Sequence, residues 1–170
     1  MPTNENMDAI AMLEADHRKV EELFAAFESA SGDGKKQTLA EQICMELTVH
    51  TKLEEHIFYP ACEGSVEEDL IKEAYVEHDG AKVLIAEIEA GEPGDEFYDA
   101  KVKVLSEMIE HHVEEEEEDD GIFAQARRAG LNLDELGERM AAEKAELLAD
   151  YQRDGSPDPE TPTLTATTLG

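Results

Sequence analysis

One histidine stands in each of four successive amphipathic segments of this 170-residue chain, where the pattern of the segment requires an apolar residue. A glutamate follows two of them four residues later, so the set is His17, His50 with Glu54, His78, and His112 with Glu116. Residues four apart on an α-helix lie on the same face, about one turn apart. An imidazole and a carboxylate at this spacing can therefore reach the same ion, and this donor pair suits iron, manganese or zinc.

The apolar residues of these segments recur every three or four positions, and runs of alternating β-branched residues are absent. This period predicts four helices, over about residues 7–30, 35–62, 66–90 and 96–119. Short loops between them favour antiparallel neighbours. The sequence therefore predicts an all-α protein built on an up-down-up-down four-helix bundle over about residues 7–123.

The C-terminal part of the chain has a different pattern. An amphipathic segment over about residues 133–151 predicts an additional helix, which Asn132 or Asp134 could cap. From residue 153 the chain is rich in proline, threonine and glycine, a composition typical of disorder. We therefore expect one domain at residues 1–152, followed by a disordered tail at residues 153–170.

The charge of the chain limits its partners. It has 43 acidic residues against 14 lysines and arginines, a net charge of -29, which opposes binding to nucleic acids or anionic membranes. No segment approaches the ~20 apolar residues of a membrane-spanning helix. The N-terminus lacks the basic start and apolar run of a signal peptide. We expect a cytoplasmic protein, with Cys44 and Cys62 as small buried residues.

The six histidines and glutamates predict a metal site when they are taken together. A single histidine in an apolar stripe is more often an ordinary core residue than a ligand. Four on four predicted helices, two of them with glutamates in register, are different, because a buried polar group without a partner costs several kcal/mol. A shared metal centre is one of the few arrangements that satisfies six such groups in one core.

Two further histidines are weaker candidates. His56 is out of register with the ligands of its helix, and His111 points about 100° away from His112. A shift in the register of the last bundle helix would make His111 and Glu115 the ligand pair. The apolar stripe through Ile109 favours His112 instead.

Tyr59 is a candidate for an additional ligand. It lies five residues after Glu54 and leans toward the same side of its helix. A phenolate is a good ligand for ferric iron. The alternative is a core aromatic residue with its hydroxyl at the rim of the core.

The order of these motifs resembles the hemerythrin-like family, in its HHE cation-binding branch. The segments that carry the resemblance are residues 14–17, 50–60, 77–79 and 112–117. The resemblance implies a non-haem site for two iron ions, bridged by Glu54, Glu116 and an oxo or hydroxo group, with the histidines capping the irons. The ferritin-like class needs Glu-x-x-His twice, and this chain has it once, at Glu14 and His17.

This chain departs from the oxygen-carrying members of the family at two positions. Those proteins have a fifth histidine four residues before the ligand of the third helix, where this chain has Ala74. Their last carboxylate ligand is an aspartate five residues after the histidine, whereas Glu116 follows His112 by four and Glu117 takes the fifth place. The missing imidazole leaves a coordination position open, which favours reactivity over reversible oxygen carriage.

The resemblance and the open position together favour a di-iron protein that reacts with O2 or peroxide in oxidative-stress handling, with a catalase- or peroxidase-like activity. Two alternatives stay open. One is a binding module that responds to O2, NO or iron, and the other is iron storage or buffering without catalysis. In each case the partners are small molecules.

Overall fold

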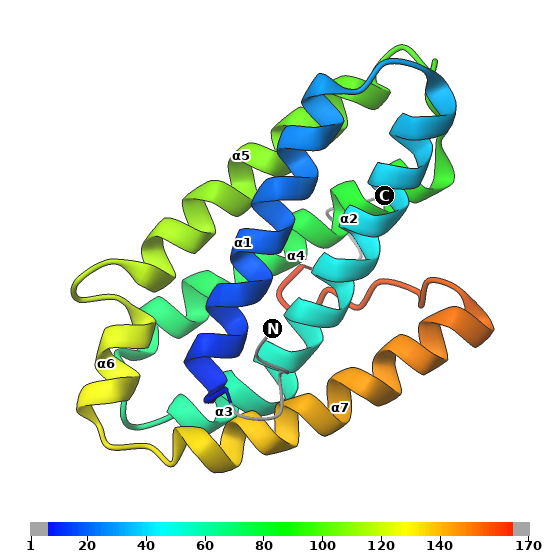
Figure 1. Cartoon of the computed structure of the whole chain (residues 1–170). Coiled ribbons are helices and arrows are strands. Elements are labelled where there is room, and N and C mark those ends of the chain that lie inside the picture. The colour runs from blue at the N-terminus through cyan, green and yellow to red at the C-terminus, as the bar shows by residue number, and fades with distance from the viewer. Residues whose placement is uncertain (1–6, 165–170) are drawn as a thin grey trace.

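Four long helices form an antiparallel bundle in the computed structural model, which describes residues 7–164 (Figure 1). They are α1 (Ala9–Ser29), α2 (Asp33–Leu53), α4 (Glu68–Ala90) and α5 (Tyr98–Glu117). Around the bundle α1 packs beside α2 and α5, and α4 packs beside the same two helices. The predicted all-α, up-down-up-down bundle is confirmed.

Local sequence features determine where α1 begins and where the chain turns back after it. The carboxylate of Asp8 accepts a hydrogen bond of 2.8 Å from the backbone N–H of Ala11, which caps the first turn. Gly32, at φ 95°, then turns the chain into α2 in a backbone conformation that glycine adopts without strain.

The second bundle helix contains a π-helical turn. After α2 the chain continues through η2 (Glu54–Phe58) into α3 (Tyr59–Cys62). The N–H of Tyr59 donates to the carbonyl of Glu54, five residues earlier. A π turn adds one residue to the helical turn, so Glu54 and Tyr59 both point into the core, where each is 0% exposed. Pro60 follows directly and has no N–H to continue the ladder.

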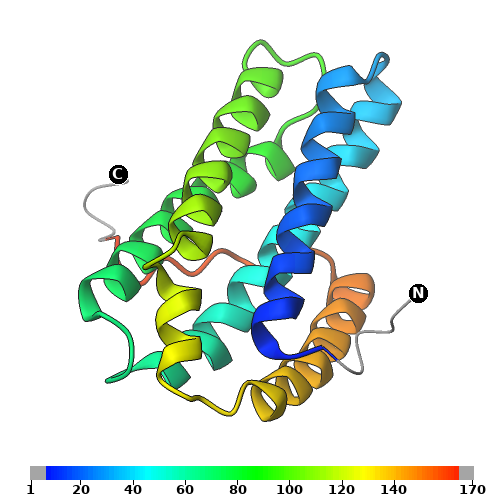
Figure 2. The same ribbon diagram turned by 60° about the vertical axis from the view of Figure 1, so that its left-hand side comes forward.

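Two helices cover one end and one side of the bundle. The short α6 (Ile122–Arg128) was not predicted, and it buries Ile122 and Phe123 under the bundle. The predicted C-terminal helix is α7 (Leu133–Asp154), which lies against α1 and α2 (Figure 2). Gly137 permits this approach, because a Cβ there would stand 2.6 Å from the carbonyl oxygen of Met7.

The segment after α7 differs from the disordered tail expected from residue 153. Residues 153 and 154 belong to α7, and residues 155–164 follow a defined course across α4. The backbone N–H and the hydroxyl of Thr163 donate to Asp79 at 2.7 and 2.6 Å, and Lys82 donates to the carbonyl of Glu160 at 2.8 Å. These hydrogen bonds hold a segment whose composition alone does not predict a packed structure. The last part of the predicted tail, residues 165–170, lies outside the described residues.

A polar layer divides the hydrophobic core into two clusters. One cluster lies toward the N-terminus of α1 and includes Leu13 and Phe58, while the other lies toward its C-terminus and includes Phe24 and Leu105. The helices α1, α2 and α4 pass from one cluster to the other near their histidines, whereas the buried apolar residues of α5 all belong to the second cluster. Both cysteines are buried and free, as predicted. Among residues 7–164, no helix combines the length and apolar content that crossing a membrane requires.

Candidate metal centre

The polar layer brings together all six residues of the predicted site. Glu54 and Glu116 are 0% exposed, and the four histidines are 2 to 5% exposed. One histidine comes from each bundle helix. Glu54 is the first residue of η2, directly after α2, and Glu116 lies on α5. The i, i+4 spacing that the sequence shows therefore places each glutamate one turn below the histidine of its own helix, inside the bundle.

The six side chains form two groups that share Glu54. His17, His50, Glu54 and Glu116 offer ligand atoms within 4.8 Å of one another, and so do Glu54, His78 and His112. Oε1 of Glu54 lies 3.1 Å from Nε2 of His50 and 3.2 Å from Nε2 of His78. Oε1 of Glu116 lies 2.7 Å from Nε2 of His112 and 3.6 Å from Nε2 of His17. Each carboxylate therefore stands between two histidines of different helices.

Several of these buried atoms have no hydrogen-bond partner. They are Nε2 of His17 and of His50, both carboxylate oxygens of Glu54, and Oε1 of Glu116. These atoms lie close together but are not aligned for hydrogen bonds with one another, so their lone pairs are available to bind an ion between them. Orphaned buried polar atoms are costly, and ions bound among them would remove that cost.

The spacing of the imidazoles also fits metal binding. Nε2 of His78 and Nε2 of His112 are 3.1 Å apart. Two nitrogens that each lie about 2.0–2.1 Å from one ion are separated by about 3 Å. On the opposite side of the layer the rings of His17 and His50 have centroids 4.9 Å apart, which makes a second pair. The donor set is imidazole and carboxylate without thiolate, which suits iron, manganese or zinc.

A ring of outer carboxylates orients the four histidines. Each histidine turns its Nε2 inward and bonds through Nδ1 to an acid on a neighbouring helix. The pairs are His17 with Glu117 at 2.7 Å, His50 with Asp16 at 3.1 Å, His78 with Glu55 at 2.8 Å, and His112 with Glu77 at 2.8 Å. Such carboxylates fix the ring orientation and raise the basicity of the ligand nitrogen.

The sequence analysis did not identify these four outer acids, although a signal for them exists. Each is the immediate sequence neighbour of an inward residue on its own helix: Asp16 precedes His17, Glu55 follows Glu54, Glu77 precedes His78, and Glu117 follows Glu116. Each bonds the histidine of the next helix around the bundle, in the order α1 to α2, α2 to α4, α4 to α5 and α5 to α1.

The charges of the cluster are balanced by protons in the metal-free protein. Burial disfavours the charged form of His50, but the charge of Glu54 and the hydrogen bond to Asp16 outweigh it and raise its pKa to about 10. Burial and the charge of Glu54 raise the pKa of Glu116 to about 7. Burial alone would raise the pKa of Glu54, yet the charge of His50, together with the close approach of Glu116 and His112, holds that pKa well below the usual range. Metal cations would replace these protons.

Tyr59 adds a hydroxyl to one half of the cluster. Its oxygen lies 3.4 Å from Nε2 of His78, 3.4 Å from Nε2 of His112, and 3.3 Å from Oε2 of Glu116. Burial and the charge of Glu116 raise the pKa of Tyr59 well above its ordinary value, so without metal it is a neutral phenol that donates to Glu116. Ala74, one turn before His78, is buried in the core and supplies no donor.

The two weaker histidine candidates lie outside the cluster. His56 is half exposed and pairs with Glu143 at 3.1 Å. His111 is 64% exposed and lies 2.9 Å from Glu115 and 3.6 Å from Glu77. The register of α5 therefore directs His112 into the core and His111 toward the surface.

Comparisons with known proteins give matches to the sequence and to the fold of this chain. The family model of the hemerythrin HHE cation binding domain matches residues 8–126. The crystal structure of a hemerythrin HHE cation binding domain-containing protein from Mycobacterium kansasii has a TM-score of 0.72, with 23% identity over 88% of this chain and 95% of that one, and it shows the shared fold. A Nostoc protein named DNA nickase is 29% identical over 113 residues, 66% of this chain. The chain spans about a third of the length of that relative, 32%.

Proposed function

Because the chain belongs to the hemerythrin HHE cation-binding family, we propose that it is a non-haem di-iron protein that reacts with O2 or hydrogen peroxide in the handling of oxidative stress. The observation that carries this proposal is the pair of His/Glu groups that share Glu54 and leave buried ligand atoms without partners. One ion satisfies the atoms of one group only. Two ions satisfy both, and carboxylate with imidazole is the donor set of non-haem iron.

The two ions would have different ligands. His17, His50, Glu54 and Glu116 would hold the first ion, and His78, His112 and Glu54 would hold the second. Tyr59 is the additional donor for the second ion, because its hydroxyl lies near both histidine nitrogens of that group. Bound iron would supply the electrons that reduce an O–O bond, or take electrons from peroxide.

The surrounding residues support a reaction more than storage. Ala74 offers no imidazole, so the protein provides fewer strong neutral ligands than oxygen carriers do. Two hydrophobic clusters enclose the polar layer and keep bulk water out. These features favour disproportionation of two hydrogen peroxide molecules into one O2 and two waters.

A nucleic-acid function is not carried over from the relative named DNA nickase. That relative is about three times longer than the shared part, and the net charge of this chain is -29. Such a charge repels a phosphate backbone.

Metal analysis and peroxide turnover test the proposal. After anaerobic loading with Fe(II), the folded protein should hold about two ions per chain, and it should evolve O2 from hydrogen peroxide over many turnovers. His56→Ala is the control and should change neither result. At most one ion per chain would refute the dinuclear site. A long-lived, reversible O2 complex without peroxide turnover would refute the enzyme and favour the binding module.

A further inference from the structure

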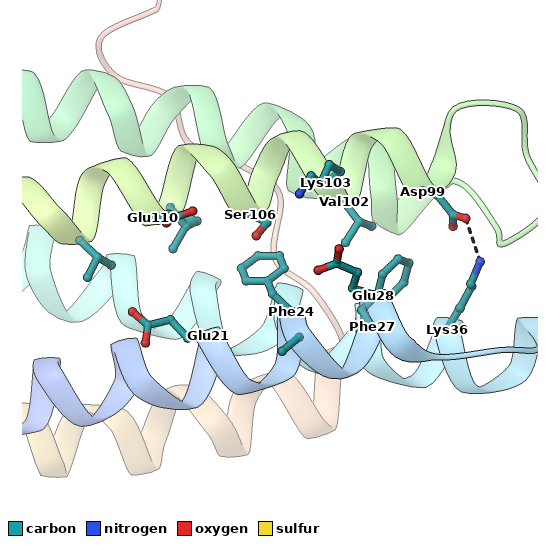
Figure 3. Close-up of a pocket in the computed structure, with 13 residues that line it drawn as sticks. Glu21, Phe24, Phe27, Glu28, Lys36, Asp99, Val102, Lys103, Ser106 and Glu110 are labelled. Atoms are coloured by element: carbon teal, nitrogen blue, oxygen red, sulfur yellow. Dashed lines mark hydrogen bonds and ion pairs between the residues drawn. The ribbon is translucent and has the colours of Figure 1, made fainter.

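A groove of about 480 Å³ opens on the face of the bundle between α1 and α5 (Figure 3). Its floor is apolar and is built from Phe24, Phe27, Val102, Ile109 and Val113. Its rim is charged, with four acids against two lysines: Glu21, Glu28, Asp99 and Glu110 against Lys36 and Lys103. Lys36 is paired with Asp99 at 2.8 Å, which leaves the acids in excess.

A much smaller cavity of about 20 Å³ lies inside the bundle, beside the candidate metal centre. All four inward histidines line it, whereas neither Glu54, Glu116 nor Tyr59 does. It therefore reaches the histidine side of the cluster. A cavity needs about 10–15 Å³ to hold one water, so this one accepts a single molecule of one or two heavy atoms.

The groove and the cavity share two lining residues, Ile109 and Val113 of α5. Val20 of α1 completes the apolar wall on the inner side. Ile109 is 8% and Val113 is 6% exposed, so each has a small area that faces the groove. The wall between the groove and the cavity is therefore built from these side chains, and rotamer changes of Ile109 and Val113 are the motion that would open it.

The opposite face of the bundle is closed more firmly. A pocket of about 170 Å³ between α2 and α4 shares only Thr51 with the inner cavity. Residues 156–160 line its outer side, and Lys82 crosses it with ion pairs to Glu55 at 3.0 Å and to Asp79 at 3.2 Å. Passage there would separate charges that are partly buried, which costs more than moving an apolar side chain.

We propose that Ile109 and Val113 are the entrance and the size filter of the metal centre, and that they admit neutral molecules of two heavy atoms while excluding organic peroxides and anions. The inference rests on the proposed function for the identity of the ligand, as O2 or hydrogen peroxide. The apolar wall disfavours charged species, and the acidic rim repels anions before they reach it.

The first test needs no reaction. Zinc-loaded protein, which is diamagnetic, is placed under O2 pressure, and paramagnetic relaxation of methyl groups is measured by NMR. The enhancement should be largest at Ile109, Val113 and Val20, and Val113→Phe should reduce it at Val20 at least about threefold. Thr51→Val, on the opposite wall, is the matched control and should leave Val20 unchanged. Enhancement that follows the Thr51 variant instead would overturn the proposal.

The second test measures selectivity in the iron-loaded protein. Val113→Phe should lower the rate of hydrogen peroxide consumption about tenfold with the iron content unchanged, and Val113→Ala should raise consumption of tert-butyl hydroperoxide about tenfold. Ile109→Ala provides a second widened variant should Val113→Ala fold poorly. Equal rates in all variants would refute the filter. If no variant consumes peroxide, the proposed function fails, and the NMR measurement still decides the route.

Discussion

Loading the metal-free protein with zinc at pH 8 should release at least about one proton per chain. Burial disfavours charge on His50, but Glu54 and Asp16 outweigh it and raise its pKa to about 10. The pKa of His112 is raised well above its ordinary value by a similar balance, in which Glu116 is the main charge. The imidazole of His50 is therefore protonated at pH 8, and it must lose the proton on Nε2 before that nitrogen can bind an ion. The raised pKa of His112 acts in the same direction.

The minimum number of protons released follows from His50, with a small addition from Glu116. The pKa of Glu116 is about 7, so it adds about half a proton at pH 7 and about a tenth at pH 8. Displacement of the His50 proton means that the overall association constant for zinc rises at least about 10-fold for each pH unit between about 7.5 and 9. Proton release should fall as the pH passes the pKa of His50, which is about 10.

Calorimetric titration with zinc in two buffers of different ionisation enthalpy measures the proton count. His56→Ala removes a half-exposed histidine outside the cluster and should leave the count unchanged. Release of less than about one proton at pH 8, or a count that does not vary up to pH 10, would refute the assignment of these imidazoles as ligands.

Glu54→Gln should bring the metal content below one ion per chain by elemental analysis, because Glu54 serves both groups; retention of two ions would contradict its bridging position. Glu55→Gln keeps every inward ligand but weakens the support of His78, and should lower zinc affinity about 10- to 100-fold in a competition titration. In calorimetric scans the metal-free protein should lose stability as the pH rises from 6.5 to 10. Protonated His50 is stabilised by the fold, and this contribution, on the order of 5 kcal/mol, is complete below pH 6.5 and gone above about pH 10. The zinc-loaded protein should not show this pH dependence. Tyr59→Phe should keep two ions but remove the phenolate-to-iron absorption of the ferric protein, and an unchanged visible spectrum would exclude Tyr59 as a ligand.

The inward residues could be predicted because they obey a rule that acts within one helix. A histidine and a glutamate four residues apart share a face whatever the helix packs against, so His50 with Glu54 could be recognised from the sequence alone. The outer acids obey a rule between helices. Glu55 points about 100° away from Glu54 on an isolated helix and resembles part of a solvated face. Its role becomes visible only when α4 brings His78 to within 2.8 Å.

Two backbone features could not be predicted from the sequence, for related reasons. The π turn at Glu54–Phe58 packs against α7 and is followed by Pro60, and a 3.6-residue period does not predict it. That turn places Tyr59 directly below Glu54, which a regular helix would do less well. The seven residues of α6 are too few for a periodicity to be recognised, and the turn into it depends on Gly121, whose Cβ position would collide with the carbonyl of Glu115.

The ring of outer carboxylates also connects the metal centre with the choice of fold. Each helix supplies an inward ligand and, one residue away, an acid for the histidine of the next helix. Sliding one helix by a turn would remove a ligand from the layer and would separate two outer pairs, one on each side of that helix. Hydrophobic stripes alone tolerate such a slide better, because apolar packing is not directional. Buried polar residues at single positions are known to specify helix register. In this bundle the polar layer acts in the same way for all four helices, so the residues that we assign to the metal centre also select the register in which it forms.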